Sequence, residues 1–431
     1  MLYRWLAVGA ALAPAWAATT PVTFHKDVLP ILQKHCQNCH RPGEVGPMSL
    51  LTYMEARPWA KAIGEAVLSK KMPPWFADPH FGKFTNARTL SKSDIDTLAA
   101  WAGSGAAEGH SSDGPAPIAF VEGWGMGKPD VVLEMPQAFD VPATGTIEYQ
   151  YIVLPTGFTE DKWVAQAEAR PGNRAVTHHI IAFVREPGSN YLRDAKPGVP
   201  FVPKPRPKGE GESRNEDAGG ASDLLVGYAP GMEAMMLKPG QAKLVKAGSD
   251  LVLQMHYTTN GKPATDRSRI GLAFAKETPR QRVFTANAMN NKFVIPPGEP
   301  NLEVTAQITL QEDAHLVDLM PHMHLRGKDF LYRLVYPTGE SETILNVPRF
   351  DFNWQLFYYL ETPKLLPKGT RIECTAHFDN SANNPGNPDP KVEVRWGPQS
   401  WEEMMIGWFE LAVDPGANPK DVLRKKKKET D

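Results

Sequence analysis

The chain has 431 residues, a formal net charge of −2 and 22% charged residues, a balance that gives no basis for a general role in binding nucleic acid. Its length allows two to four domains with several substantial cores. Proline and glycine number 40 and 35 and lie between short apolar segments, which is typical of loop-rich β domains. Because no stretch approaches the roughly 20 consecutive apolar residues of a spanning helix, we expect no transmembrane segment.

The first residues have the pattern of an export signal. Arg4 gives a short basic start, Trp5–Ala13 is an apolar run, and Ala15–Ala17 is an A-x-A cleavage pattern. We therefore expect a signal peptide over residues 1–17 and a mature protein that is periplasmic or secreted. Retention of the segment as an anchor is the alternative.

A haem attachment motif follows soon after this signal. Cys36-Gln37-Asn38-Cys39-His40 is a C-x-x-C-H sequence, in which two thiols add to the haem vinyl groups and the histidine ligates the iron. Two of the chain's three cysteines fall in this motif, so one covalently bound haem c is predicted. A chance spacing or a zinc knuckle is the alternative. The third cysteine, Cys374, then has no partner, so we expect no intramolecular disulfide.

Helical patterns flank the motif. Val28, Ile31 and Leu32 recur at helical spacing directly before it. A second helix is predicted after Ser91, because a serine is a common helix N-cap, and Gly103 is its expected stop. The sequence therefore predicts a small, all-α domain around the haem.

Between the two helices, Met72 lies in the proline-rich stretch Lys70–Trp75. The arrangement resembles a class I c-type cytochrome domain, which we place at residues 20–103. The resemblance implies that Met72 is the sixth iron ligand, where a thioether raises the reduction potential and favours electron relay over oxygen chemistry. The alternatives are a packing role for Met72, another nearby methionine, or a second histidine ligand. These other candidates are Met48, Met54, His25 and His35.

The rest of the chain indicates β structure, after a linker at 104–128 that is rich in glycine, serine, alanine and proline. Short segments are rich in β-branched and aromatic residues and are bounded by turn formers. Without intervening helices, antiparallel sandwiches are favoured over βαβ units. We expect two tandem all-β sandwiches at 129–285 and 286–415, a surface insertion at 193–222 and a basic tail at 416–431. The predicted strands are Tyr149–Leu154, Trp163–Ala169, His179–Val184, Leu251–Thr258, Ile270–Ala275, Leu302–Leu310 and Phe330–Tyr336.

Histidines in the β region have spacings that suit metal ligands. Residues i and i+2 of a strand share a face, so His322 and His324 can bind one metal ion. Adjacent residues point to opposite faces, so His178 and His179 can share a metal only at a strand end or a β-bulge. His256 lies late in another predicted strand. An H-x-H on a strand is a moderately specific signal, whereas an isolated His-His pair is a weak one.

Together with a later methionine, these histidines resemble the copper ligands of the copper type II, ascorbate-dependent monooxygenases, the family of peptidylglycine hydroxylase and dopamine β-hydroxylase. Thr177-His178-His179 is similar to the family's His pair, and Leu253-Gln254-Met255-His256-Tyr257 to the setting of its third ligand. His322-Met323-His324 is similar to its H-x-H, and Glu402-Glu403-Met404 to the pair that supplies a thioether. Met405 is the competitor for that last role.

The resemblance implies two facing jelly-roll sandwiches that hold two copper ions. The electron-accepting copper would have three imidazole ligands, and the catalytic, oxygen-binding copper would have two imidazoles and a thioether, which favours Cu(I). The implied ligands are His178, His179 and His256 for the first copper, and His322, His324 and Met404 for the second.

The implied reaction is O2-dependent C–H hydroxylation of a small organic substrate, with electrons relayed through haem c from an external donor, either an ascorbate-like reductant or a redox protein. Met320 stands where the peptide-amidating members have a substrate-binding arginine, which argues against a glycine-extended peptide. Met405 stands where the animal enzymes usually have a cysteine that pairs with one matching Cys374, so that disulfide is absent. The alternatives are a non-catalytic periplasmic electron-transfer or copper-binding protein, and a haem redox sensor.

Overall fold

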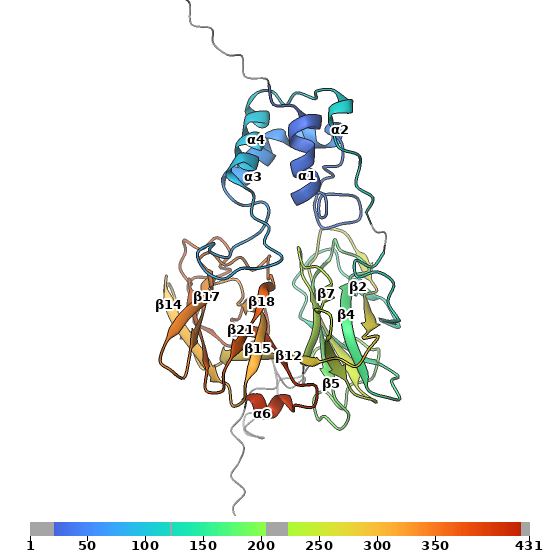
Figure 1. Cartoon of the computed structure of the whole chain (residues 1–431), viewed down its shortest axis with the longest axis vertical. Coiled ribbons are helices and arrows are strands. Elements are labelled where there is room, and N and C mark those ends of the chain that lie inside the picture. Colours follow the sequence, from blue (N-terminus) through green and yellow to red (C-terminus); the bar gives the residue numbers. More distant parts are fainter. Residues whose placement is uncertain (1–20, 121–122, 204–222, 424–431) are drawn as a thin grey trace, which may run out of the picture. The chain divides into compact units, whose positions relative to one another are not determined.

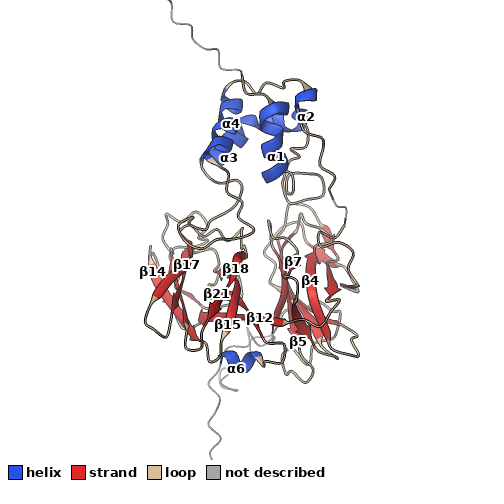
Figure 2. Cartoon of the chain, viewed as in Figure 1, coloured by secondary structure: helices blue, strands red, loops and turns tan. Residues whose placement is uncertain are grey.

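The computed structural model describes residues 21–120, 123–203 and 223–423. The predicted signal peptide lies outside these residues, as do most of the predicted insertion and the basic end of the tail. The chain forms two compact units, the first built from residues up to Pro42 with Gly46–Pro73 and Leu90–Ile118. The second contains Gly43–Val45, Pro74–Thr89 and the chain from Ala119 onward. Helices gather in the first unit and strands in the second (Figures 1 and 2).

The described residues of the first unit form helices and loops, as the sequence predicts for the region around the haem motif. The predicted second helix is confirmed, because Ser91 accepts a hydrogen bond from the Asp94 N–H and Asp94 returns one to Ser91, which is a capping box. Phe24 and Trp101 meet in the core with ring centroids 5.9 Å apart. The helices are η1 (Phe24–Val28), α1 (Leu29–His35), α2 (Tyr53–Ala56), η2 (Arg57–Trp59), α3 (Ala60–Leu68), α4 (Lys92–Gly103) and η3 (Ser111–Asp113).

The boundaries of this unit differ from the predicted domain at 20–103. Residues 104–118, predicted as linker, belong to the unit because Ala107 accepts a backbone hydrogen bond from Phe24 and Ala116 accepts one from the Gln33 side chain. Pro74–Thr89 belongs instead to the second unit. There Trp75 and Phe84 pack against the Tyr358 ring, with centroids 4.9 and 5.5 Å away. These apolar side chains find their partners on a strand that is distant in sequence, which no local pattern indicates.

The second unit is built from β-sandwiches, as predicted, and the seven predicted strands are observed to within a few residues at their ends. The first sandwich packs two sheets on a core that includes Ile152, Val164, Ile180, Leu253 and Leu272. One sheet has β1 (Val131–Glu134), β11 (Arg269–Phe274), β4 (Lys162–Arg170), β8 (Gln241–Val245) and β7 (Met235–Met236), and the other β3 (Gln150–Pro155), β9 (Asp250–Tyr257), β5 (Thr177–Arg185) and β6 (Asp223–Tyr228).

The second sandwich has its own core, which includes Leu319, Phe330, Tyr332, Ile372 and Phe409. One sheet has β12 (Gln281–Asn290), β21 (Met405–Val413), β15 (Ala314–His322) and β18 (Tyr358–Leu366). The other has β14 (Leu302–Thr309), β19 (Arg371–Phe378), β16 (Gly327–Val335) and β17 (Ser341–Val347). The remaining elements are the strand pairs β2 (Phe139–Val141) with β10 (Ala264–Asp266) and β13 (Val294–Ile295) with β20 (Val394–Arg395), and the helix α6 (Pro419–Leu423).

The two sandwiches share one continuous sheet, and the boundary predicted at residue 285 falls inside a strand. β12 pairs with β21 from Arg282 to Asn290, and it also pairs in parallel with β8 of the first sandwich through Gln281 and Arg282. This joins the sheets into a nine-stranded one. The second sandwich therefore begins with β12. A strand with one partner 40 residues away and another more than 100 residues away cannot be assigned to a sandwich from its own sequence, because period-2 alternation is the same on either side.

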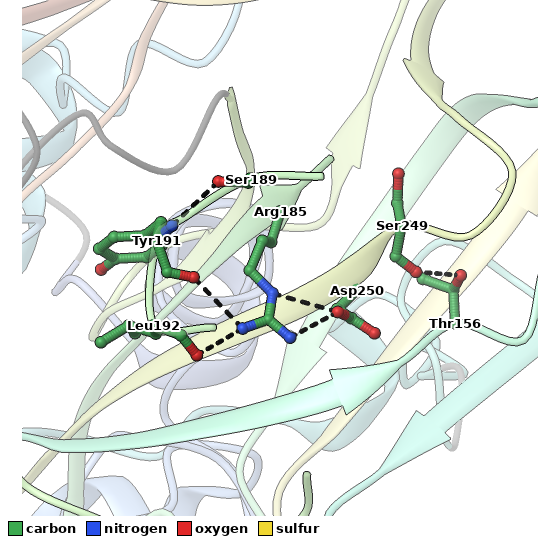
Figure 3. A network of polar contacts seen from close by, with 7 residues as sticks. All are labelled: Thr156, Arg185, Ser189, Tyr191, Leu192, Ser249 and Asp250. Carbon is green, nitrogen blue, oxygen red and sulfur yellow. Dashed lines mark hydrogen bonds and ion pairs between the residues drawn. The ribbon is translucent and has the colours of Figure 1, made fainter. Parts of the chain in front are cut away.

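A polar network sets the pairing register of β5 and β9 (Figure 3). Arg185 and Asp250 are cross-strand partners, and the Arg185 guanidinium donates to Asp250 Oδ2 at 2.6 and 3.1 Å. The same guanidinium donates to the carbonyl oxygens of Tyr191 and Leu192 at 3.2 and 2.7 Å. A one-residue slip would separate the ion pair and reverse the two faces of the strand. At the other end of the same two strands, this register places His179 opposite His256.

A buried charged cluster lies where the two sandwiches meet. Lys243 of β8 and Glu410 of β21 are 1% and 4% exposed at their side chains, with Nζ 2.5 Å from Oε1. Lys243 Nζ also donates to the Leu224 carbonyl at 2.6 Å and to the Thr285 hydroxyl at 3.0 Å. Asp318 of β15 lies beside Glu410, and burial, followed by the repulsion of Glu410, holds the pKa of Asp318 well above its usual range. Burial and this repulsion thus favour the protonated form of Asp318, while Glu410 pairs with Lys243.

Lys243→Met is expected to destabilise the protein by about 3–5 kcal/mol, because it leaves a buried carboxylate without its cation. Denaturant unfolding at neutral pH measures this free energy. The matched control is Lys162→Met, since Lys162 pairs with Glu160, whose side chain is 74% exposed, and such a pair contributes under about 1 kcal/mol. Equal effects of the two changes would contradict a stabilising role for the buried pair.

Within the part of the chain that the structure describes, no helix is both long and apolar enough to cross a membrane.

Candidate metal centres

A β-bulge brings His178 and His179 together with His256. Thr177 pairs with Tyr257 and His179 with His256, and the register shifts between the two pairs, so His178 is the extra residue of the bulge. Such a bulge breaks the strict alternation of side chains. A β-bulge, like a strand end, is a place where adjacent histidines can share a metal ion. The ring centroids of His178 and His179 lie 4.8 and 4.9 Å from that of His256.

The ring nitrogens of this three-histidine group are placed as metal donors. One nitrogen from each of His178, His179 and His256 lies within 4.8 Å of the others. His178 Nδ1, His179 Nε2 and His256 Nδ1 are buried and have no hydrogen-bond partner in the protein. Buried polar atoms are normally paired, so unpaired nitrogens this close together indicate donors for an ion. Neutral imidazoles suit copper in either oxidation state, and the residues present fit a copper ion.

Burial keeps these imidazoles neutral. It lowers the pKa of His256 to about 3, with a smaller repulsive contribution from His178. Burial also lowers the pKa of His179 well below its usual value, helped by repulsion from His256 and the other histidines. The pKa of His178 is lowered by burial and partly restored by a hydrogen bond with the Asn353 side chain. A metal ion needs the unprotonated ring, so the group is ready to bind one at neutral pH without losing protons.

The H-x-H pair lies at the end of β15 and is oriented by carbonyl oxygens. His322 Nδ1 bonds to Gln355 Oε1 at 2.5 Å, and His324 Nδ1 bonds to the Glu402 carbonyl at 3.2 Å. Since both acceptors are carbonyl oxygens, each Nδ1 carries the proton and each Nε2 keeps its lone pair. Burial lowers the pKa of His322 to about 4 and that of His324 well below its usual value. The rings are 5.2 Å apart between centroids.

Met404 lies on the same face of the sheet as these histidines, and Met405 lies on the opposite face. The β15–β21 register pairs His322 with Ile406 and Met320 with Trp408. Met320, Met404, Ile406 and Trp408 then pack together in one apolar cluster, whereas Met405 lies in the core of the second sandwich. Met404 therefore lies on the sheet face of His322, and a donor set of two imidazoles and a thioether would fit a copper ion, with a preference for Cu(I).

Glu403 fixes the turn that carries His324. Its carboxylate is buried and accepts the backbone N–H of His324 at 2.8 Å and that of Arg326 at 2.6 Å. Burial raises the pKa of Glu403 to about 8, against the opposing effect of these hydrogen bonds. The Arg326 side chain, also buried, donates to Asn380 Oδ1 at 2.8 Å. The histidine thus sits on a turn held from both sides.

Two aromatic residues that sequence reasoning missed contact the metal groups. The Tyr149 ring lies 4.7 Å from the His256 ring and 5.2 Å from the His179 ring, and its buried hydroxyl has no hydrogen-bond partner in the protein. The Phe352 ring stacks on His178 at 5.2 Å and meets His324 edge-on at 6.0 Å. Gln355, bonded to His322, was also missed. These residues lie in segments without a metal-ligand motif, and only their tertiary position gives them a role.

In the helical unit, the predicted haem attachment residues follow α1 directly. His40 Nδ1 bonds to the Met48 carbonyl at 3.3 Å, which leaves Nε2 to face a metal. Burial lowers the pKa of His40, with that hydrogen bond acting against it. A Cβ at Gly46 would lie 2.7 Å from His40 Nδ1, so only glycine allows this close approach. None of the three cysteines forms a disulfide. Cys36, Cys39 and His40 therefore fit covalent haem attachment.

The candidates for the predicted sixth iron ligand differ in the hydrogen bonds that they already make. The Met48 carbonyl accepts from His40 Nδ1, which is not the nitrogen left to face a metal, so this contact gives no support for Met48 as the sixth ligand. His25 Nε2 lies 3.5 Å from Glu108, whereas His35 Nε2 is buried without a hydrogen-bond partner. Met72 follows α3, where its backbone N–H donates to the Ala66 carbonyl at 3.2 Å. Met72 and His35 thus both stay open as ligands.

Comparison with known proteins relates one part of the chain to a monooxygenase. The chain matches no protein-family model. It is 23% identical over 197 residues to the chicken (Gallus gallus) "DBH-like monooxygenase protein 1", a stretch that covers 40% of this chain and 30% of that protein.

Among solved structures, VP2 of infectious bursal disease virus is 10% identical with a TM-score of 0.20, covering 68% of this chain and 74% of its own. PNGF-II is 9% identical with a TM-score of 0.30, covering 66% and 65%. These TM-scores support no argument about function. The chain thus resembles a DBH-like monooxygenase in part, over less than a third of that relative's length.

Proposed function

We propose that this protein is an exported copper monooxygenase that hydroxylates a C–H bond of a small organic substrate with O2. The observation that carries the proposal is the pair of donor sets in the second unit: three unpaired nitrogens at His178, His179 and His256, and an oriented H-x-H beside a thioether. The partial likeness to a DBH-like monooxygenase adds support.

Copper, when bound, would supply one-electron steps and the reaction with O2. The chain's own residues prepare the two sites for these roles. His178, His179 and His256 offer three imidazoles, which suit both oxidation states of an ion that accepts and passes on electrons. His322 and His324 with Met404 form the softer set, suited to the Cu(I) that meets O2. Gln355 and the Glu402 carbonyl hold the protons of this pair on Nδ1.

The helical unit would hold the haem through Cys36, Cys39 and His40, with Met72 as the proposed sixth ligand. Hydroxylation needs two electrons for each O2, so a haem in the same chain as an electron-accepting copper suits the reaction. The external donor is proposed to be an ascorbate-like reductant or a redox protein. A covalent haem c and an export-type sequence start are both expected of a periplasmic or secreted protein.

The surroundings of the H-x-H pair favour an uncharged substrate. Met320, Trp408 and Ile406 form the buried surface on its sheet face, and Met232 and Met289 pack against them. Position 320 is a methionine, which offers no positive charge to a substrate carboxylate.

Metal and haem analysis of the purified protein tests the proposal. A copper monooxygenase of this design should carry one covalent haem and two coppers per chain, and the reduced protein should consume O2 faster when a substrate is added. Two coppers without substrate-dependent O2 uptake across a panel of small organic compounds would favour the copper-binding or electron-transfer alternative. Haem iron without copper would favour the redox sensor.

A further inference from the structure

One turn of the second sandwich reaches both metal groups. Residues 351–355, between β17 and β18, are here called the bridging turn. The Asn353 backbone N–H and its side-chain amide both donate to Asp351 Oδ1 at 3.0 Å, and the Trp354 N–H donates to the Asp351 carbonyl at 2.9 Å. The Gln355 side-chain amide donates to the Phe352 carbonyl at 3.3 Å. An aspartate that closes a turn in this way limits its conformations, so the bridging turn is held by its own hydrogen bonds.

The polar side chains of the bridging turn each bind a histidine of a different group. The Asn353 side chain lies close enough to His178 of the three-histidine group to raise the pKa of that imidazole. Gln355 Oε1 accepts the Nδ1 proton of His322 in the H-x-H pair. The turn is therefore anchored to both groups, although they belong to different sandwiches.

Phe352 projects from this turn between the imidazoles of the two groups. Its ring stacks on His178 at a centroid distance of 5.2 Å and an angle of 15°. It lies 6.3 Å from the His256 ring, and 6.0 Å from the His324 ring at 82°. A single phenyl ring thus contacts imidazoles of both groups.

We infer that Phe352 is the spacer between the two copper centres, and that it prevents any ligand from bridging them. This inference rests on the proposed function. A phenyl ring has no lone pair with which to bind a metal, and it displaces water from the space that it fills. With the ring held by Asn353 and Gln355, each copper stays mononuclear. With both coppers bound, a small ligand held at one ion would then have no open path to the other.

Electron paramagnetic resonance (EPR) of the holoprotein loaded with Cu(II) tests this role, with azide as the probe. Azide is a small anion that can link two Cu(II) ions, and their spins then pair and the EPR signal falls. The wild type is expected to show the full intensity of two Cu(II) ions per chain, with and without azide. Phe352→Ala should bind both coppers, because Phe352 is not a ligand, and should lose most of its intensity when azide is added. Phe352→Leu, which keeps part of the volume, should lose less and serves if the alanine variant folds poorly.

Phe293→Ala is the matched control, because Phe293 is also half-buried and stacks on Phe378 at 5.2 Å in the second sandwich. It should behave as the wild type. A wild type that loses intensity with azide, or a Phe352→Ala protein with two coppers and an undiminished signal, would overturn the spacer and leave the proposed function standing. A wild type that binds fewer than two coppers would overturn the proposed function, and the inference with it.

Discussion

Replacing His256 with alanine is expected to remove one of the two proposed copper ions and to stop turnover that depends on electrons from the proposed haem. His256 faces His179 across the β5–β9 pair and has a buried, unpaired Nδ1. Two imidazoles remain in the variant, which is too few for a tight site. Since losing a residue that only orients a ligand already costs 10–100-fold in metal affinity or activity, losing a ligand should cost more than about 100-fold. Copper content and steady-state O2 uptake measure the effect.

The second copper should be retained in this variant, because its proposed ligands come from the second sandwich and from Met404. A pre-reduced sample should then still react with O2 once, although repeated turnover fails. His315→Ala is the control, since His315 is half-buried on β15 outside both donor sets. A His256→Ala protein that keeps two coppers would show that the three-histidine group is not a copper site.

Replacing Met404 with alanine should weaken Cu(I) binding at the H-x-H pair by about tenfold or more and affect Cu(II) much less, because a thioether is the soft ligand of the set. Met404 lies on the histidine face with Met320 and Trp408. Competition titrations with a Cu(I) chelator and a Cu(II) chelator separate the two oxidation states.

The Met405→Ala variant tests whether Met404 or Met405 supplies the thioether. Met405 is fully buried in the core of the second sandwich, so its truncation should cost about 2–5 kcal/mol of unfolding free energy. Its Cu(I) affinity should stay at the wild-type level. If Met405→Ala carries the Cu(I) loss, the thioether ligand is the other methionine. If neither variant loses Cu(I) affinity, the oxygen-binding centre is not built from this segment.

The features that can be predicted from the sequence alone are those set by residues close together in the chain. Strand positions such as Tyr149–Leu154 and Leu302–Leu310 follow from β-branched and aromatic residues bounded by turn formers, and the helix after Ser91 follows from its cap; the structure has all three. The spacing in Cys36–His40 is also contained in one short stretch. Strand geometry also predicts a shared face for an H-x-H, but β15 ends at His322 and His324 lies on the turn that follows.

Tertiary structure decided what depends on distant partners. The pairing of β5 with β9 creates the bulge at His178, and the β15–β21 register puts Met404 rather than Met405 on the histidine face. Contacts with distant segments also make β12 join the two sandwiches and make Pro74–Thr89 part of the second unit. Phe352 and Gln355 carry no local signal, because nothing in a turn sequence states which distant side chains it will meet. Only the closure of long chain segments brings them to the metal groups.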